Sequence, residues 1–135
     1  MLERILYQSR ATNDFSSLHL FNLLTDAQHR NERLEITGHL LYLRGGFTQC
    51  IEGPTEHVEQ LWQRILRDPR HHQIELLVRR PIERRNFPEW SMAFSTYSSF
   101  YVHGMRGFFP IQADQASPLT QVCTADLELF ANSWA

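Results

Sequence analysis

Short runs of apolar residues, several of them alternating with polar ones, occur five times along the chain. Alternation places successive side chains on opposite faces of an extended backbone, so these runs predict β-strands. The predicted strands cover residues 3–9, 36–43, 45–54, 73–79 and 90–97. Arg44 and the two glycines after it have the composition of a tight turn, so the second and third strands are expected to form a hairpin.

Two longer segments instead repeat their apolar residues every three or four positions, which is the period of a helix with one buried face. The first helix is expected to start near Ser16 or Ser17, either of which can cap it. Its apolar stripe consists of Leu20, Leu24 and Ala27, and the next position of the stripe is the polar Asn31. The second helix follows Gly53–Thr55 and ends before Pro69. Its stripe consists of Val58, Leu61, Trp62 and Ile65.

The order of these elements is βαββαββ, and residues 98–135 follow the last strand. Two helices on one face of a five-stranded mixed sheet, most of it antiparallel, form a ferredoxin-like α+β sandwich. Ser117 and Pro118 open a further helix over about residues 118–133. We therefore expect a domain over residues 1–97 and a C-terminal extension over 98–135. The helix of this extension either caps the second face of the sheet or docks on a partner.

Three polar side chains fall on faces that the pattern predicts to be apolar, namely Tyr7, Asn31 and Gln49. The first and third strands lie side by side at the centre of a ferredoxin-like sheet, so Tyr7 and Gln49 are expected to be neighbours under the helices. A buried amide is costly unless it forms hydrogen bonds. Nearby backbone or water satisfies such groups in most proteins, whereas a polar ligand lodged between the helices would satisfy all three. The pattern leaves both interpretations open.

Composition and charge narrow the range of functions. The chain of 135 residues has the length of one domain, and its formal net charge of −2 argues against a nucleic-acid binder, which needs a clustered positive surface. Cys50 and Cys123 lie far apart without a CxxC motif, which favours free thiols in a reduced cytoplasmic compartment. No metal site is expected, because His71 and His72 point to opposite faces of an extended chain. No apolar run reaches the roughly 20 residues that span a membrane, and no signal peptide is visible.

Four groups of residues follow one another along the chain. They are Asn31 with Ile36-Thr37-Gly38, then Phe47-x-Gln49-x-x-Glu52-Gly53-Pro54, then Arg64-Ile65-x-x-Asp68-x-Arg70-His71, and finally Arg84-Arg85-x-Phe87-x-x-Trp90-Ser91-Met92. In order and spacing these groups resemble the motifs of the BLUF family, the sensors of blue light using flavin. Tyr7, which follows two apolar residues, matches the first strand of that family. The match runs from about residue 2 to 97 and implies the same fold that the pattern predicts.

The resemblance implies a flavin bound without a covalent link, either FAD or else FMN or riboflavin. It implies that Gln49 bridges the Tyr7 hydroxyl to the flavin edge at N5 and O4, and that Asn31 holds the edge with O4 and N3. Ile36 and Ile65 are expected to sandwich the ring between apolar side chains. The flavin tail is expected to lead towards residues that suit its phosphates, namely Arg64, Asp68, Arg70 and His71.

The resemblance also implies a mechanism. Tyr7 is expected to give an electron and then a proton to the excited flavin. Gln49 relays the proton and returns in a rotated or tautomeric form, which shifts the flavin absorption to the red until darkness reverses the change. Trp90 and Met92 share a face of the predicted last strand, and one of them is expected to approach Gln49. Exchange between these two side chains would carry the signal to the segment after residue 97.

Three positions depart from the pattern of the family. Glu35 stands where glycine is usual before Ile-Thr-Gly, which suggests a different turn after the first helix. Arg30 stands where Asn or His is commoner, and it either reaches the flavin edge or points to water. His39 on the second strand is also unusual. These departures concern tuning and lifetime rather than the Tyr7, Asn31 and Gln49 group.

The short, stand-alone members of the family are the ones that this chain resembles, and they act through a separate signalling protein. The expected function is therefore that of a photoreceptor and not of an enzyme, and a homodimer or higher homo-oligomer stays open. One alternative is a flavin-binding interaction module without productive photochemistry. An RNA-binding module is disfavoured, because Arg44–Phe47 matches its motif only loosely and Thr48–Cys50 departs from it. An acylphosphatase-like enzyme is also disfavoured, because residues 9–15 after the first strand are too weak a candidate for its phosphate cradle.

Overall fold

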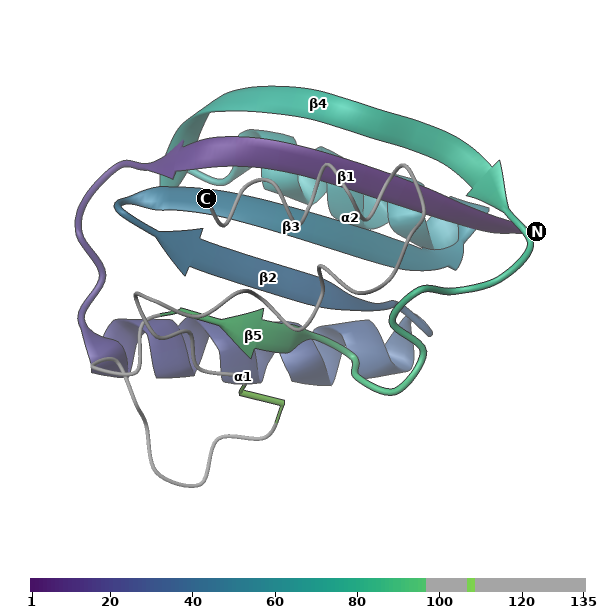
Figure 1. The fold of residues 1–135 in the computed structure, drawn as a ribbon, viewed down its shortest axis with the longest axis horizontal. Coiled ribbons are helices and arrows are strands. Elements are labelled where there is room, and N and C mark those ends of the chain that lie inside the picture. The colour runs from purple at the N-terminus through teal and green to yellow at the C-terminus, as the bar shows by residue number, and fades with distance from the viewer. Residues whose placement is uncertain (97–106, 109–135) are drawn as a thin grey trace, which may run out of the picture.

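A computed structural model describes residues 1–96 and 107–108, and within them it contains the five strands and the first two helices that the sequence predicts, in the predicted order (Figure 1). The elements are β1 (Leu2–Ala11), α1 (Ser17–Arg33), β2 (Thr37–Leu43), β3 (Gly46–Pro54), α2 (Thr55–Arg67), β4 (His71–Ile82) and β5 (Ala93–Ser95). Ser16 caps α1, because its hydroxyl accepts a hydrogen bond from the backbone N–H of His19 at 3.2 Å.

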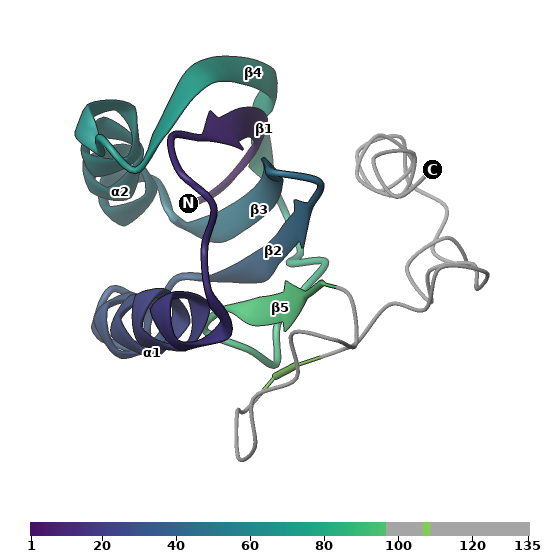
Figure 2. The same ribbon diagram turned by 90° about the vertical axis from the view of Figure 1, so that its left-hand side faces the viewer.

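The strands form one sheet in the order β4-β1-β3-β2-β5. Neighbouring strands are antiparallel except for β2 and β5, which are parallel. Figure 2 shows α1 and α2 together on one side of this sheet. The ferredoxin-like α+β sandwich with a five-stranded mixed sheet is thus confirmed. β1 pairs with β3 so that Tyr7 lies opposite Gln49, as the fold predicts.

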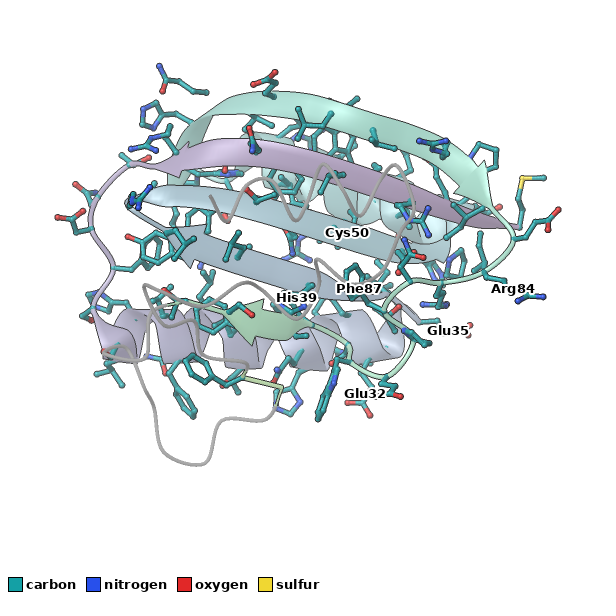
Figure 3. All side chains as sticks on the ribbon, viewed as in Figure 1. Glu32, Glu35, His39, Cys50, Arg84 and Phe87 are labelled. Atoms are coloured by element: carbon teal, nitrogen blue, oxygen red, sulfur yellow. The ribbon has the colours of Figure 1, made fainter. Side chains whose placement is uncertain are left out.

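The core lies on both faces of the sheet. On the face that the helices cover, the predicted stripes of α1 and α2 are buried and pack on inward-facing residues of the strands. On the opposite face a smaller cluster consists of Leu6, Leu41, Cys50, Val78 and Phe87. Figure 3 shows His39 and Phe87 beside each other on this opposite face, with ring centroids 5.5 Å apart.

The last strand differs from the prediction. β5 begins at Ala93, so Trp90 and Met92 do not share a face of a strand, and that expectation is wrong. The backbone before Ala93 is instead held by contacts with other elements, such as the hydrogen bond from the Gly38 N–H to the Trp90 carbonyl at 3.2 Å. Residue 97, the predicted helix over 118–133 and almost all of the extension lie outside the described residues.

The turn after α1 keeps a left-handed residue at Glu35, whose φ is +56°. The Ile36 N–H donates to the Asn31 carbonyl at 2.9 Å and closes this turn. Glycine adopts this backbone conformation most easily, whereas any other L-residue in it costs roughly 1–2 kcal/mol. The substitution of glycine by Glu35 therefore leaves a glycine-type turn in place, with a strained residue in it, rather than a different turn.

Candidate functional site

Tyr7 on β1 and Gln49 on β3 form the centre of the site. Both side chains lie on the helix-covered face and are buried, with 4% and 8% of their surface exposed. The Tyr7 hydroxyl donates a hydrogen bond to Oε1 of Gln49. The other end of the same amide, Nε2, lies 3.4 Å from the Met92 sulfur and donates to it. The Gln49 amide therefore connects a phenol to a thioether across the middle of the sheet.

A cavity of about 80 Å³ lies beside this pair, lined by residues of both α1 and α2. Eight of the residues singled out in the sequence line it, namely Tyr7, Arg30, Gln49, Ile65, Asp68, Arg70, His71 and Met92. Apolar side chains complete the lining, and they are Phe15, Leu23, Leu24, Ala27, Leu40, Phe47 and Leu61. The sequence analysis placed several of these in helix stripes but assigned none of them to the site, because a core residue and a cavity residue share the same period.

Asn31 follows the cavity residue Arg30 on α1; it does not itself line the cavity, but it keeps a free acceptor. Its side chain is 1% exposed, and its Nδ2 donates to the Ser91 carbonyl at 3.0 Å. Its Oδ1 is buried without a hydrogen-bond partner among the described residues, and so are Nε of Arg30 and Nδ2 of Asn86. Buried polar atoms are satisfied in most proteins, so two such atoms on neighbouring residues of α1 point to a missing polar group at this place.

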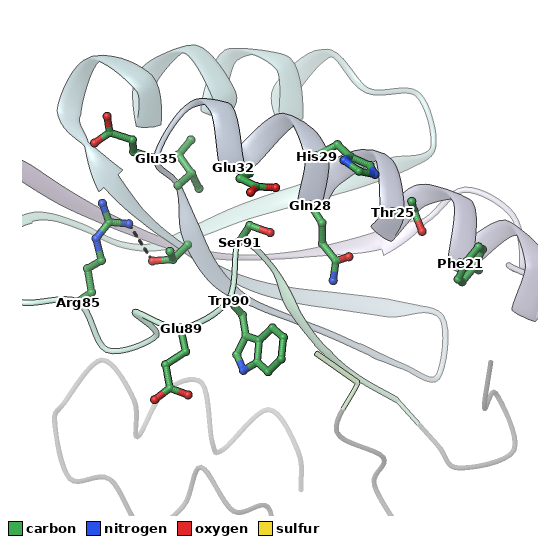
Figure 4. Close-up of a pocket in the computed structure, with 12 residues that line it drawn as sticks. Phe21, Thr25, Gln28, His29, Glu32, Glu35, Arg85, Glu89, Trp90 and Ser91 are labelled. Atoms are coloured by element: carbon green, nitrogen blue, oxygen red, sulfur yellow. Dashed lines mark hydrogen bonds between the residues drawn. The ribbon is translucent and has the colours of Figure 1, made fainter. Parts of the chain in front are cut away.

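Three predicted residues lie elsewhere. Ile36 is buried in the core, and together with Trp90 it lines a separate groove of about 510 Å³ along the outer side of α1 (Figure 4). Arg64 is exposed in a groove on the outer surfaces of α1 and α2, where Arg30 and Arg67 also lie. Met92, and not Trp90, is therefore the side chain that approaches Gln49 in this structure.

Comparison with known proteins decides the family. Residues 2–93 match the family model described as BLUF, sensors of blue-light using FAD. The chain belongs to the BLUF family. It is 35% identical over 133 residues to the photoactivated adenylate cyclase subunit beta of Euglena longa, a match that covers 98% of this chain and 15% of the relative. The chain thus spans about 15% of the length of the curated relatives it matches first.

Two solved BLUF structures show the same fold. The dark-state structure of BlrB, a BLUF protein, is 38% identical with a TM-score of 0.66, and the match covers 69% of this chain and 70% of BlrB. BlrP1 of Klebsiella pneumoniae, solved with FMN and cyclic diGMP, is 34% identical with a TM-score of 0.65, and the match covers 70% and 25% of the two chains. A flavin is thus the cofactor of this family.

Burial, together with a nearby negative charge, keeps the Tyr7 phenol neutral. Burial, and then the negative charge of Asp68, raise the pKa of Tyr7 far above its ordinary value. Arg70 forms hydrogen bonds to both carboxylate oxygens of Asp68, with an ion-pair distance of 2.6 Å, and holds the pKa of Asp68 below its ordinary value. Tyr7 of this BLUF domain therefore keeps its proton across the physiological pH range.

Arg30, which also lines the cavity, is close to more positive charge than the nearby carboxylates offset. Burial lowers the pKa of Arg30, and so do the positive charges of Arg64 and Arg70, while Asp68 and Asp26 act in the opposite sense. Since Asp68 is already bonded to Arg70, an anion would relieve the repulsion among the three arginines.

His71 has both ring nitrogens engaged. One lies 2.7 Å from the Ser9 hydroxyl, and the other lies 2.7 Å from the Ile65 carbonyl and must donate to it. These contacts tie β4 to α2 and β1 at the cavity wall, and the place of His71 near the flavin phosphates stays a prediction.

The donor set fits a flavin, whose edge combines carbonyl acceptors with ring nitrogens: the Gln49 and Asn31 amides offer both donors and acceptors, beside apolar walls. The cavity is smaller than the roughly 300–1,000 Å³ of ordinary small-molecule sites, so side chains between α1 and α2 must move apart to admit the ring. Within residues 1–96 and 107–108, no three His, Cys, Asp or Glu side chains gather as a metal site. The same residues contain no helix that is long and apolar enough to cross a membrane.

Proposed function

We propose that this BLUF domain binds a flavin between α1 and α2 and signals blue light to a separate partner protein. The observation that carries this proposal is the Tyr7–Gln49 hydrogen bond beside a cavity next to which Asn31 keeps an unsatisfied acceptor. A phenol and two amides in this arrangement offer a redox-active group and a hydrogen-bonding edge to one ligand.

Gln49 and Asn31 would hold the polar edge of the flavin, and Ile65 would contact its ring. Ile36 is buried and does not line the cavity, so it would support the flavin-binding residues from the core instead of contacting the ring. Arg30 and Arg70 lie at the cavity wall and suit a phosphate, with exposed Arg64 further out. FAD is the proposed flavin, and FMN fits the same group of arginines.

When bound, the flavin supplies an oxidant that blue light switches on. Tyr7 would then give an electron from its ring to this oxidant and pass the proton of its hydroxyl to Oε1 of Gln49. The same electron and proton would return to Tyr7 as Gln49 settles in a rotated or tautomeric form, so that no net redox change remains. In the rotated form the amide oxygen would face the Met92 sulfur and could not donate to it, so this contact would change.

Met92 leads directly into β5, so a change at its side chain reaches the edge of the sheet and the segment after it. The partner then senses a shift between two populated states, and light changes its affinity only by the difference in binding to these states. Residues 1–97 form the sensory domain in this proposal, and residues 98–135 connect it to the partner. The chain itself acts as a cytoplasmic sensor rather than as an enzyme, and its self-association is left to experiment.

The proposal is tested with the purified chain loaded with FAD. Blue illumination should shift its absorption to the red and darkness should reverse the shift. Tyr7→Phe should retain the flavin and abolish the shift, because the redox-active hydroxyl is removed. Tyr42→Phe is the matched control, since Tyr42 is another buried tyrosine on the same face but does not line the cavity. A full shift in Tyr7→Phe would overturn the mechanism.

Flavin retained without any light response in the unmodified chain would instead support the interaction module without photochemistry. The buried, hydrogen-bonded amide of Gln49 favours the photoreceptor over this alternative, because simple flavin binding needs no phenol in contact with that amide.

A further inference from the structure

On the face of the sheet opposite the flavin site, a carboxylate is completely buried. Glu52 on β3 has no exposed surface. Its Oε2 accepts hydrogen bonds from Nε of Arg4 at 2.9 Å and from Nη2 of Arg4 at 2.8 Å. The backbone N–H of Asn86 donates to both carboxylate oxygens at 2.9 Å, and the backbone N–H of Phe87 donates to Oε1 at 2.8 Å. Glu52 thus joins β1 and β3 to a loop that lies 34 positions further along the chain.

The same loop is attached beside Glu52 by two arginines. Nη1 of Arg85 donates to the Thr37 hydroxyl at 2.9 Å and to the Glu52 carbonyl at 3.1 Å. Figure 4 shows the first of these bonds as a dashed line from Arg85 to the start of β2. Nη2 of Arg4 donates to the Arg84 carbonyl at 3.3 Å. Residues 84–87 are therefore held on three adjacent strands.

The other end of this loop touches the photoactive group. The Ser91 carbonyl accepts a hydrogen bond from Asn31 at 3.0 Å, and the Met92 carbonyl accepts one from Nε2 of Gln28 at 2.9 Å. The Met92 sulfur accepts from Gln49. Residues 84–92 thus form a strap, fixed at one end by the Glu52 carboxylate and at the other by the side chains of the flavin site.

We propose that Glu52 is a positioning residue for the light response: by fixing the start of the strap, it sets where Met92 stands relative to Gln49 and how fast the light-induced arrangement relaxes in the dark. This inference rests on the proposed function of the Tyr7–Gln49 pair. Glu52 itself does not line the cavity, so it acts through the strap and not by contact with the flavin.

Burying the Glu52 carboxylate costs desolvation free energy, so a contribution to stability alone does not explain its presence. A buried ion pair gains little over apolar residues of the same volume, and it is better suited to fixing one arrangement among several. Here two of its four donors are backbone N–H groups of an irregular loop, which no sheet ladder would hold in place. The carboxylate therefore replaces the ladder bonds that residues 86–87 lack.

The test uses the full chain with methionine labelled by ¹³C at the methyl group. Glu52→Gln keeps the shape of the side chain but removes the negative charge that faces Arg4 and reduces the acceptor capacity that holds the strap. We expect the Met92 methyl signal to shift and broaden in this variant, both with and without flavin. In the FAD-loaded variant the red-shifted state should form and then recover in the dark faster by at least about fivefold, because a loosened strap lowers the barrier to return.

Glu3→Gln is the matched control. Glu3 is a buried carboxylate on β1 that pairs with Arg79 of β4, and none of its contacts reaches residues 84–92. This variant should keep the Met92 signal and the dark-recovery rate of the unmodified chain. If the loss of any buried ion pair were enough to change the Met92 signal and the recovery rate, Glu52→Gln and Glu3→Gln would show the same changes. That outcome would overturn the inference.

Arg85→Met provides a second test if Glu52→Gln does not fold, because it cuts two strap bonds and leaves the Glu52 carboxylate in place. Faster recovery with an altered Met92 signal supports the inference, and unchanged values in whichever variant folds contradict it. A failure of the proposed function would look different. The unmodified chain would then show no light response, while the Met92 methyl signal would still change when a strap contact is removed.

Discussion

On the helix-covered face of the sheet, Asn31 keeps a buried oxygen without a partner, whereas on the opposite face the Glu52 carboxylate accepts hydrogen bonds from Arg4, Asn86 and Phe87. Both groups are almost completely shielded from water. The two groups differ in their hydrogen bonds: the Asn31 oxygen lacks a partner among the described residues, whereas the Glu52 carboxylate finds its partners within the chain. Of these two groups, only Asn31 therefore points to a ligand from outside the chain.

The largest expected effect is on stability. Glu52→Ala should lower the free energy of unfolding of the flavin-free chain by about 3–5 kcal/mol, because it removes one partner of a buried ion pair and the acceptor of two backbone N–H groups. Asn31→Ala should cost only about 1 kcal/mol, since its amide makes one hydrogen bond, to the Ser91 carbonyl. Urea denaturation measures both values. Equal losses of unfolding free energy in Glu52→Ala and Asn31→Ala would contradict the difference in hydrogen bonding between the two groups.

A second prediction concerns pH and the face opposite the helices. His39 there bonds to the Ser95 hydroxyl at 2.7 Å, and burial lowers the pKa of His39 to about 3. Between this value and the ordinary pKa near 6.5, the unfolded chain binds a proton that the folded chain does not. Stability should therefore fall as the pH falls below about 6.5, by about 2 kcal/mol at pH 5.

His39→Gln, which can still bond to Ser95, should lack this contribution. Urea denaturation at pH 7.5 and 5 compares the two chains, and parallel losses of stability in both would refute the assignment to His39.

The sequence predicted the helix-covered face better than the opposite one. The period of two and the ferredoxin-like strand order place Tyr7 opposite Gln49, and the period of α1 places Asn31 in the buried stripe. The Glu52 cluster has no such signal, because half of its donors are backbone N–H groups of a distant loop. For the same reason the position of Trp90 was missed: loop hydrogen bonds rather than strand alternation determine it.

The smallest effect concerns a position between the two regions. Glu35→Gly should raise the free energy of unfolding by about 0.5–1 kcal/mol, because relief of the left-handed strain exceeds the extra entropy of glycine in the unfolded chain. Thermal unfolding of the flavin-free chain measures it. A loss of stability would mean that the Glu35 side chain contributes more than its backbone costs.

The most direct test of the account is the light-minus-dark absorption spectrum of the FAD-loaded Gln49→Leu variant. Leucine fills a similar volume but removes the acceptor of the Tyr7 hydroxyl and the donor to Met92. The account predicts a yellow protein without the reversible red shift, while Gln63→Leu on the exposed side of α2 keeps the shift in full. A reversible red shift that persists in Gln49→Leu would contradict the central role of this amide.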